Sequence, residues 1–62
     1  MALNRYYDNM ADNYIIPKAE MTAEMWGEAQ ALLSKSFYDG GYVLMTIDDG
    51  EGECWCITSF IE

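Results

Sequence analysis

The spacing of apolar residues changes at Asp39–Gly40–Gly41, and this change restricts the fold more than any other feature of the chain. Before it, apolar residues recur every three or four positions, as on one side of an α-helix. After it, two short runs are rich in β-branched and aromatic residues, as in β-strands. Because 62 residues provide material for only one core, we expect a single small α+β domain over residues 1–62.

The clearest predicted element is a helix from Thr22 to Tyr38. Thr22 is a suitable N-cap, and the acidic residues around it favour the positive end of the helix dipole. Asp39, Gly40 and Gly41 are expected to end the helix, with a glycine in the left-handed conformation. The apolar stripe of this helix comprises Met25, Trp26, Ala29, Leu32, Leu33 and Phe37.

A weaker helix is predicted over residues 2–14, where apolar side chains again recur every three or four positions. Its asparagines and aspartates are poor helix formers, so an irregular aromatic arm is the alternative. Pro17 should end any helix in this region, because the residue before a proline is pushed toward an extended conformation.

The carboxy-terminal part predicts an antiparallel β-hairpin that packs on the second helix. Its strands are Tyr42–Ile47 and Cys54–Ile61, joined by turn residues from Asp48 to Glu53. A loop with an odd number of residues would place Val43, Met45 and Ile47 on the same face as Trp55 and Ile57, and an even loop would exchange the faces of the second strand. Both faces are apolar in either register, so the face away from the helix needs a cover, which the amino-terminal segment, a partner or a second copy would supply.

The net charge of −8, with three bases and no histidine, excludes several function classes. Such a surface repels phosphate and anionic lipid, so we expect no direct binding to nucleic acid or to membranes. Attraction over long distances favours partners with basic patches, and nucleic-acid-binding proteins have the largest of these. The alternative is that the charge only keeps the chain soluble.

Acidic residues are most dense in the predicted turn, at Asp48, Asp49, Glu51 and Glu53. The turn does not fit a calcium-binding loop between two helices, so we expect no metal there, and a divalent-cation site at the turn is a third hypothesis. A solvated turn without function is the main alternative to a contact surface for lysine and arginine. Glu20, Glu24 and Glu28 recur every four residues, about 6 Å apart on a helix, which resembles phosphate spacing along a nucleic acid. Ordinary exposed helix positions are the alternative reading.

The predicted partner-binding residues therefore combine carboxylates with tyrosines near the ends of the elements, since exposed tyrosines often anchor interfaces. They are Glu20, Glu24, Glu28, Asp39, Asp48, Asp49, Glu51, Glu53, Tyr6, Tyr7, Tyr38 and Tyr42.

Catalysis has little support in the sequence. Without histidine, Ser34, Ser36 or a cysteine has no ordinary general base, and Cys54 and Cys56 alone cannot complete a zinc site. We therefore expect no enzyme, no cofactor and no metal. Two strand positions apart, the cysteines are too distant for an unstrained disulfide, which favours reduced cysteines in a cytoplasmic protein. The first ten residues do not fit a signal peptide.

In its size, its lack of histidine and its crowded carboxylates, the chain resembles the small acidic proteins of bacteriophages and mobile elements that disable host defence, including anti-CRISPR proteins. No aligned motif carries the resemblance. It implies a stoichiometric inhibitor, in the bacterial host cytoplasm, that occupies a basic nucleic-acid-binding surface of a host effector complex as a DNA mimic. The alternative function is a homodimer or adaptor module that completes its sheet with another chain.

Overall fold

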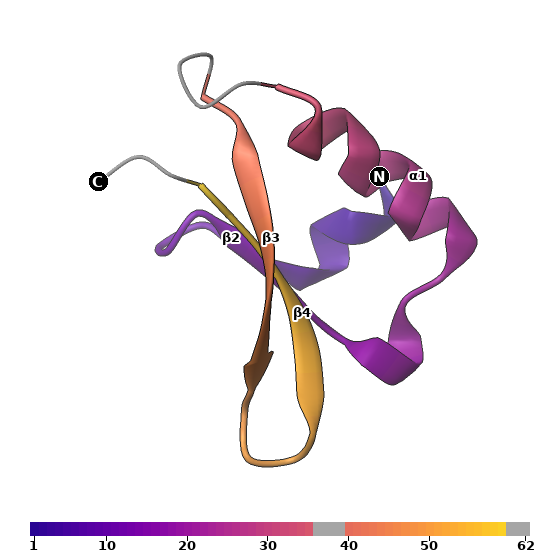
Figure 1. Cartoon of the computed structure of the whole chain (residues 1–62), viewed down its shortest axis with the longest axis vertical. Helices are drawn as coiled ribbons and strands as arrows, with labels where there is room; N and C mark the ends of the chain where they lie inside the picture. The colour runs from indigo at the N-terminus through magenta and orange to yellow at the C-terminus, as the bar shows by residue number, and fades with distance from the viewer. Residues whose placement is uncertain (36–39, 60–62) are drawn as a thin grey trace.

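The computed structural model describes residues 1–35 and 40–59. These form one α-helix and a four-stranded antiparallel sheet with the strand order β1-β2-β4-β3, so the fold is α+β (Figure 1). The helix and short η1 lie on one side of the sheet (Figure 1). In chain order the elements are η1 (Ala2–Tyr6), β1 (Tyr7–Asp8), β2 (Asn13–Pro17), η2 (Lys18–Glu20), α1 (Ala23–Leu33), β3 (Tyr42–Asp48) and β4 (Glu53–Ser59).

The predicted amino-terminal helix over residues 2–14 is wrong. The segment forms the short 3-10 helix η1 and then a small hairpin, in which Tyr7 of β1 pairs with Tyr14 of β2. Their ring centroids are 4.8 Å apart. The seven-residue spacing of these tyrosines, which fits a helix, here brings the two rings together across two strands. Asp12 closes the turn with a φ of 53°, a left-handed conformation that aspartate tolerates better than most residues.

Helix α1 begins where the sequence predicts and ends earlier. The Thr22 hydroxyl accepts a hydrogen bond from the Met25 N–H at 3.2 Å, which confirms the predicted cap. The last helical residue is Leu33 and not the predicted Tyr38. Beyond it, the Ser34 hydroxyl donates to the Ala31 carbonyl at 3.1 Å, and such side-chain bonds to the backbone compete with helix continuation.

Part of the predicted helix end falls outside the described residues, namely Phe37, Tyr38 and Asp39. Gly40 has the expected left-handed conformation with a φ of 76°, although α1 has already ended at Leu33.

The carboxy-terminal hairpin is present, and its register is the even one. Asp48 pairs with Glu53, which leaves four residues between β3 and β4. Met45 therefore lies opposite Cys56, and Leu44 lies opposite Ile57. The odd-loop register, with Met45 on the face of Trp55, is wrong. The last two residues of the predicted second strand, Phe60 and Ile61, are outside the described residues.

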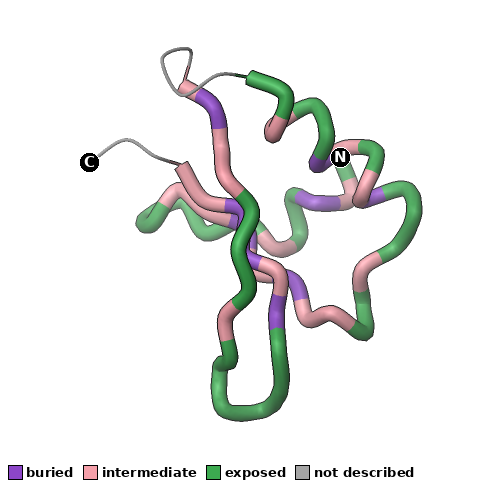
Figure 2. Tube along the Cα trace, viewed as in Figure 1, coloured by how far each residue is buried: buried purple, intermediate pink, exposed green. Residues whose placement is uncertain are grey.

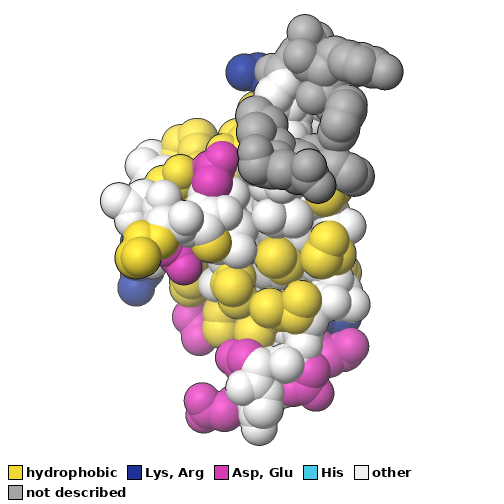
Figure 3. All heavy atoms as spheres, turned by 90° about the vertical axis from the view of Figure 1, so that its left-hand side faces the viewer, with side chains coloured by type: hydrophobic (Ala, Val, Ile, Leu, Met, Phe, Trp, Pro, Cys, Tyr) yellow, Lys and Arg dark blue, Asp and Glu magenta, His cyan; other side chains and the backbone are white. Residues whose placement is uncertain are grey.

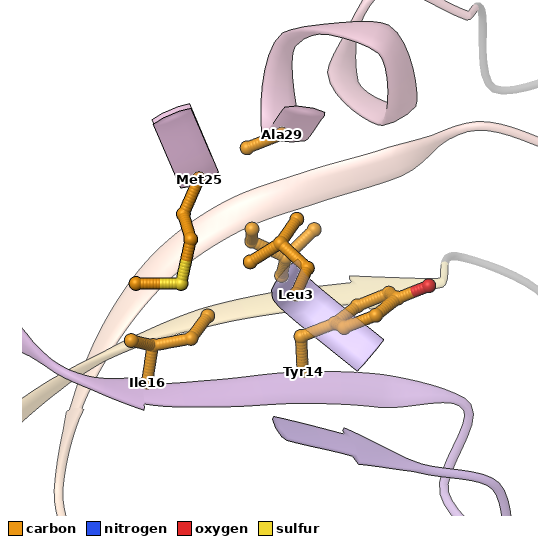
Figure 4. Close-up of a cluster of buried hydrophobic side chains, with 6 residues drawn as sticks. Leu3, Tyr14, Ile16, Met25 and Ala29 are labelled. Carbon is orange, nitrogen blue, oxygen red and sulfur yellow. The ribbon is translucent and has the colours of Figure 1, made fainter. Parts of the chain in front are cut away.

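The core lies between α1, η1 and one face of the sheet (Figures 2 and 4). Figure 4 shows Met25 and Ala29 pointing from α1 toward β2, with Leu3 of η1 between them. Trp26 and Trp55 extend this contact, because their rings meet edge to face with centroids 5.1 Å apart. The predicted packing of the hairpin on the helix is thus matched only in part, because η1 and β2 contribute much of the core. Its buried members are Leu3, Tyr14, Ile16, Met25, Ala29 and Ile57.

Candidate protein-binding site

Acidic side chains gather at the end of the molecule formed by the β3–β4 turn, which we call the acidic end (Figure 3). An open depression of about 560 Å³ lies between this turn and η2. Figure 2 shows that the turn itself is exposed throughout. The acidic end comprises Glu20, Asp48, Asp49, Glu51 and Glu53, of which all but Asp48 line the depression.

Backbone hydrogen bonds hold the carboxylates of the turn in place. The Gly50 N–H donates to Oδ1 of Asp48 at 2.8 Å, and the Glu51 N–H donates to Oδ1 of Asp49 at 2.9 Å. Gly50 and Gly52 have φ angles of 96° and 137°, which side chains rarely allow. The turn therefore presents its charges in an ordered geometry.

One base lies at this end. Lys18 Nζ is 3.4 Å from Oε1 of Glu53 and 4.4 Å from the centroid of the Trp55 ring. This is the one ion pair found among the described residues, and it leaves four carboxylates of the acidic end without a basic partner there. Such a concentration of one charge produces a directed negative potential.

The three glutamates predicted to form one acidic line do not form it. Glu20 lies in η2 and not in α1, and the Tyr6 hydroxyl donates to its Oε1 at 2.7 Å. Glu28 is bound by the amino-terminal backbone, because the N–H groups of Ala2 and Leu3 donate to its two carboxylate oxygens at 3.1 and 3.0 Å. The Leu3 hydrogen bond is the main reason that the pKa of Glu28 lies below its usual value.

The remaining glutamate, Glu24, is exposed in the first turn of α1. The predicted contact residues Tyr38 and Asp39 lie outside the described residues.

Two of the predicted tyrosine anchors, Tyr7 and Tyr42, form a polar cluster around Asp12. The hydroxyls of Tyr7 and Tyr42 both donate to Oδ1 of Asp12, at 2.8 and 2.9 Å. The Tyr7 bond, followed by the Tyr42 bond, lowers the pKa of Asp12. Burial, reinforced by this carboxylate, raises the pKa of Tyr42 to about 12. Asp12 and Tyr42 are 30 residues apart, so no local sequence pattern indicates the contact, and the sequence does not predict this cluster.

The sheet face away from α1 is apolar, and no described element covers it (Figure 3). The amino-terminal segment does not provide the expected cover, because η1 packs on the opposite face and β1 and β2 extend the sheet. Met45 is 45% exposed on this face. We call it the open face, defined by Ile15, Pro17, Val43, Met45, Ile47, Cys54 and Cys56. The polar residues Asn13 and Thr58 share this face at the end away from the acidic end.

The cysteines of the open face are free thiols. Both are buried, and burial raises the pKa of each thiol. Cys54 Sγ also donates to Oδ2 of Asp49 at 3.5 Å. Within residues 1–35 and 40–59, no group of three or more acidic, cysteine or histidine residues is arranged to hold a metal ion. In the same part of the chain, every helix is too short or too polar to cross a membrane.

Comparison of the chain with protein-family models, with curated proteins and with solved structures found no match.

Proposed function

We propose that this chain binds a basic protein surface through its acidic end. The observation that supports this proposal best is that four carboxylates of one short turn are presented together, two of them held by backbone N–H groups. Grouping like charges costs electrostatic free energy, which a complementary basic surface offsets. Because the geometry is already ordered in the free chain, little further ordering is needed on binding.

The class of partner follows from the charge. With a net charge of −8, the chain is attracted over long distances to basic proteins and repelled by nucleic acids. Asp48, Asp49, Glu51 and Glu53 lie together on one exposed turn, which is compatible with lysines and arginines that otherwise bind a phosphate backbone. The partner that fits best is a nucleic-acid-binding protein.

The more specific proposal is a stoichiometric inhibitor that mimics DNA, as in the anti-defence proteins that the chain resembles. It would occupy the nucleic-acid groove of an effector complex in the cytoplasm of a bacterial host. The combination of small size, strong negative charge and an ordered acidic turn supports this proposal.

The test is capture from a bacterial lysate on the immobilised chain, followed by elution in a salt series and competition with duplex DNA. We expect the captured protein to bind DNA and to elute between about 0.2 and 0.5 M NaCl, where exposed charge pairs are strongly screened. Asp49→Asn should weaken capture about two- to fivefold, within the range of single exposed charge pairs.

Asp8→Asn is the matched control. Both aspartates accept turn N–H bonds through Oδ1, which asparagine preserves, but Asp8 lies in β1 at the opposite end of the sheet. Capture that resists salt, or that responds equally to the two substitutions, would show that the acidic end is not the contact.

A second candidate is an adaptor that adds a strand of another protein to β3. β3 is an edge strand of the described sheet, and Tyr42–Ile47 contains neither a charge nor a proline to block strand addition. Thr46→Pro should then abolish capture while Asp49→Asn leaves it unchanged. The opposite pattern would exclude this candidate.

A further inference from the structure

The sheet is apolar on both faces, and in the described part of the chain only one of them is covered. An apolar sheet face normally packs against a second layer. In β2, β3 and β4, the positions that share the open face carry no charged side chain. We propose that two copies of this chain pack open face against open face, as a twofold symmetric dimer whose acidic ends point in opposite directions.

The charge distribution favours a second copy over a basic partner on this face. The carboxylates of the β3–β4 turn lie beyond one end of the open face, and its centre around Met45 and Cys56 is uncharged. Lysines and arginines of a partner would be attracted to the acidic end and would lose hydration without compensation on the open face. An uncharged apolar surface fits this face better, and a second copy supplies one.

The same distribution determines the orientation of the two copies. A twofold axis perpendicular to the strands places the two acidic ends on opposite sides of the dimer. Seven residues of β3 span about 24 Å, which is beyond the Debye length of about 8 Å at physiological salt. Packing with both acidic ends together would place the two crowded turns side by side, and their repulsion disfavours it.

The size of the face predicts the strength of association. Three strands of seven residues or fewer give a contact of roughly 14 by 24 Å, or about 700 Å² for both copies together. Stable interfaces bury about 1,200 Å² or more, so we expect a weak, reversible dimer and not a permanent one.

The test is sedimentation velocity from about 10 µM to 1 mM in a reducing buffer, which prevents covalent dimers through the cysteines. The expected result is a shift from the chain mass of 7.1 kDa toward twice that mass. Raising NaCl from about 0.05 to 0.5 M should strengthen the dimer severalfold, because salt screens the repulsion between two chains of charge −8. A single species of 7.1 kDa throughout would overturn the proposal.

Two substitutions on β3 localise the contact. Met45→Lys places a charge at the centre of the open face and should weaken the dimer at least about tenfold. Leu44→Lys is the control, because Leu44 is 38% exposed on the other face of the same strand and the change in net charge is identical. Circular dichroism should show both variants folded. Equal effects of the two substitutions would indicate pairing through the β3 edge and would overturn the face-to-face arrangement.

The dimer does not depend on the proposed binding of a basic protein. Salt strengthens the dimer and weakens the complex with a basic protein, so the failure of one leaves the other open to test.

Discussion

At the scale of single residues, Glu28 shows how a charge that looks suited to an interface can have an internal role. Its carboxylate accepts two N–H bonds from the amino-terminal backbone, and this backbone carries the fully buried Leu3. The side chain therefore holds η1 against α1. An amide nitrogen cannot accept a hydrogen bond, so Glu28→Gln should lower the melting temperature at neutral pH.

The pH dependence of this effect follows from the lowered pKa of Glu28. Its contribution to stability is present above the ordinary value of 4.5 and is lost as pH falls through the lower pKa of the folded state. The difference in melting temperature between wild type and Glu28→Gln should therefore shrink below pH 4.5. Glu24→Gln, at an exposed position of the same helix, is the control with the same change in net charge. A difference that is constant with pH would contradict this role.

For Tyr42 we expect the opposite pH dependence, a loss of stability at high pH. Its pKa of about 12 means that the neutral hydroxyl is favoured in the folded chain. Its stabilising effect is complete below the ordinary value of 10.0 and is lost as pH rises toward 12. Tyr42→Phe should cost about 1 kcal/mol at pH 8, because one hydrogen bond to Asp12 is lost.

An ultraviolet titration of tyrosine ionisation checks this assignment. The wild type should show a step near pH 12, and Tyr42→Phe should lack it. Persistence of the same step in the variant would assign it to another tyrosine.

At the scale of elements, the sequence predicts the parts whose signals are local. Thr22 marks the start of α1 by itself, and alternating apolar residues on both sides of an acidic, glycine-containing turn predict the hairpin. The amino-terminal segment is different, because Tyr7 and Tyr14 are seven residues apart and fit two turns of a helix as well as a pair of strands. Strand β2 of this segment pairs with β1 on one side and with β4 on the other, and the pairing with β4 is a long-range contact that no local pattern indicates.

The cap of α1 is a direct test at this scale. Thr22→Ala removes the hydroxyl that accepts the Met25 N–H and should cost about 1 kcal/mol. In a domain of this size that corresponds to a drop in melting temperature of about 4–8 °C. Thr22→Ser keeps the hydroxyl and should retain most of the stability. If serine and alanine lower the melting temperature equally, the hydrogen bond is not the source of the effect.

At the scale of the whole molecule, composition indicates how much charge and apolar surface there is, but not where each lies. The sequence predicts four carboxylates on the hairpin turn, and the fold brings Glu20 beside them through η2. It also predicts two apolar sheet faces, but the side that η1 takes depends on the packing of Leu3 against Ile16 and Ile57. The open face results from this long-range choice.

The separation of the acidic end from the open face leads to a prediction that couples both proposals. The double substitution Asp49→Asn and Glu51→Gln changes the net charge from −8 to −6, while the amide oxygen of the introduced asparagine can still accept the turn N–H. It should lower the salt concentration at which the captured basic protein elutes. It should also strengthen self-association at low salt, because two chains of smaller charge repel each other less.

The control is the double substitution Asp8→Asn and Glu24→Gln, which reaches the same net charge away from the acidic end. In the capture assay it should elute at the wild-type salt concentration. Near 1 M NaCl, where the Debye length is about 3 Å, the acidic-end variant and the wild type should dimerise equally. If two acidic chains meet through a separate uncharged face, removing negative charge can only strengthen their contact. A variant at the acidic end that weakened both associations would therefore show that one surface binds both partners.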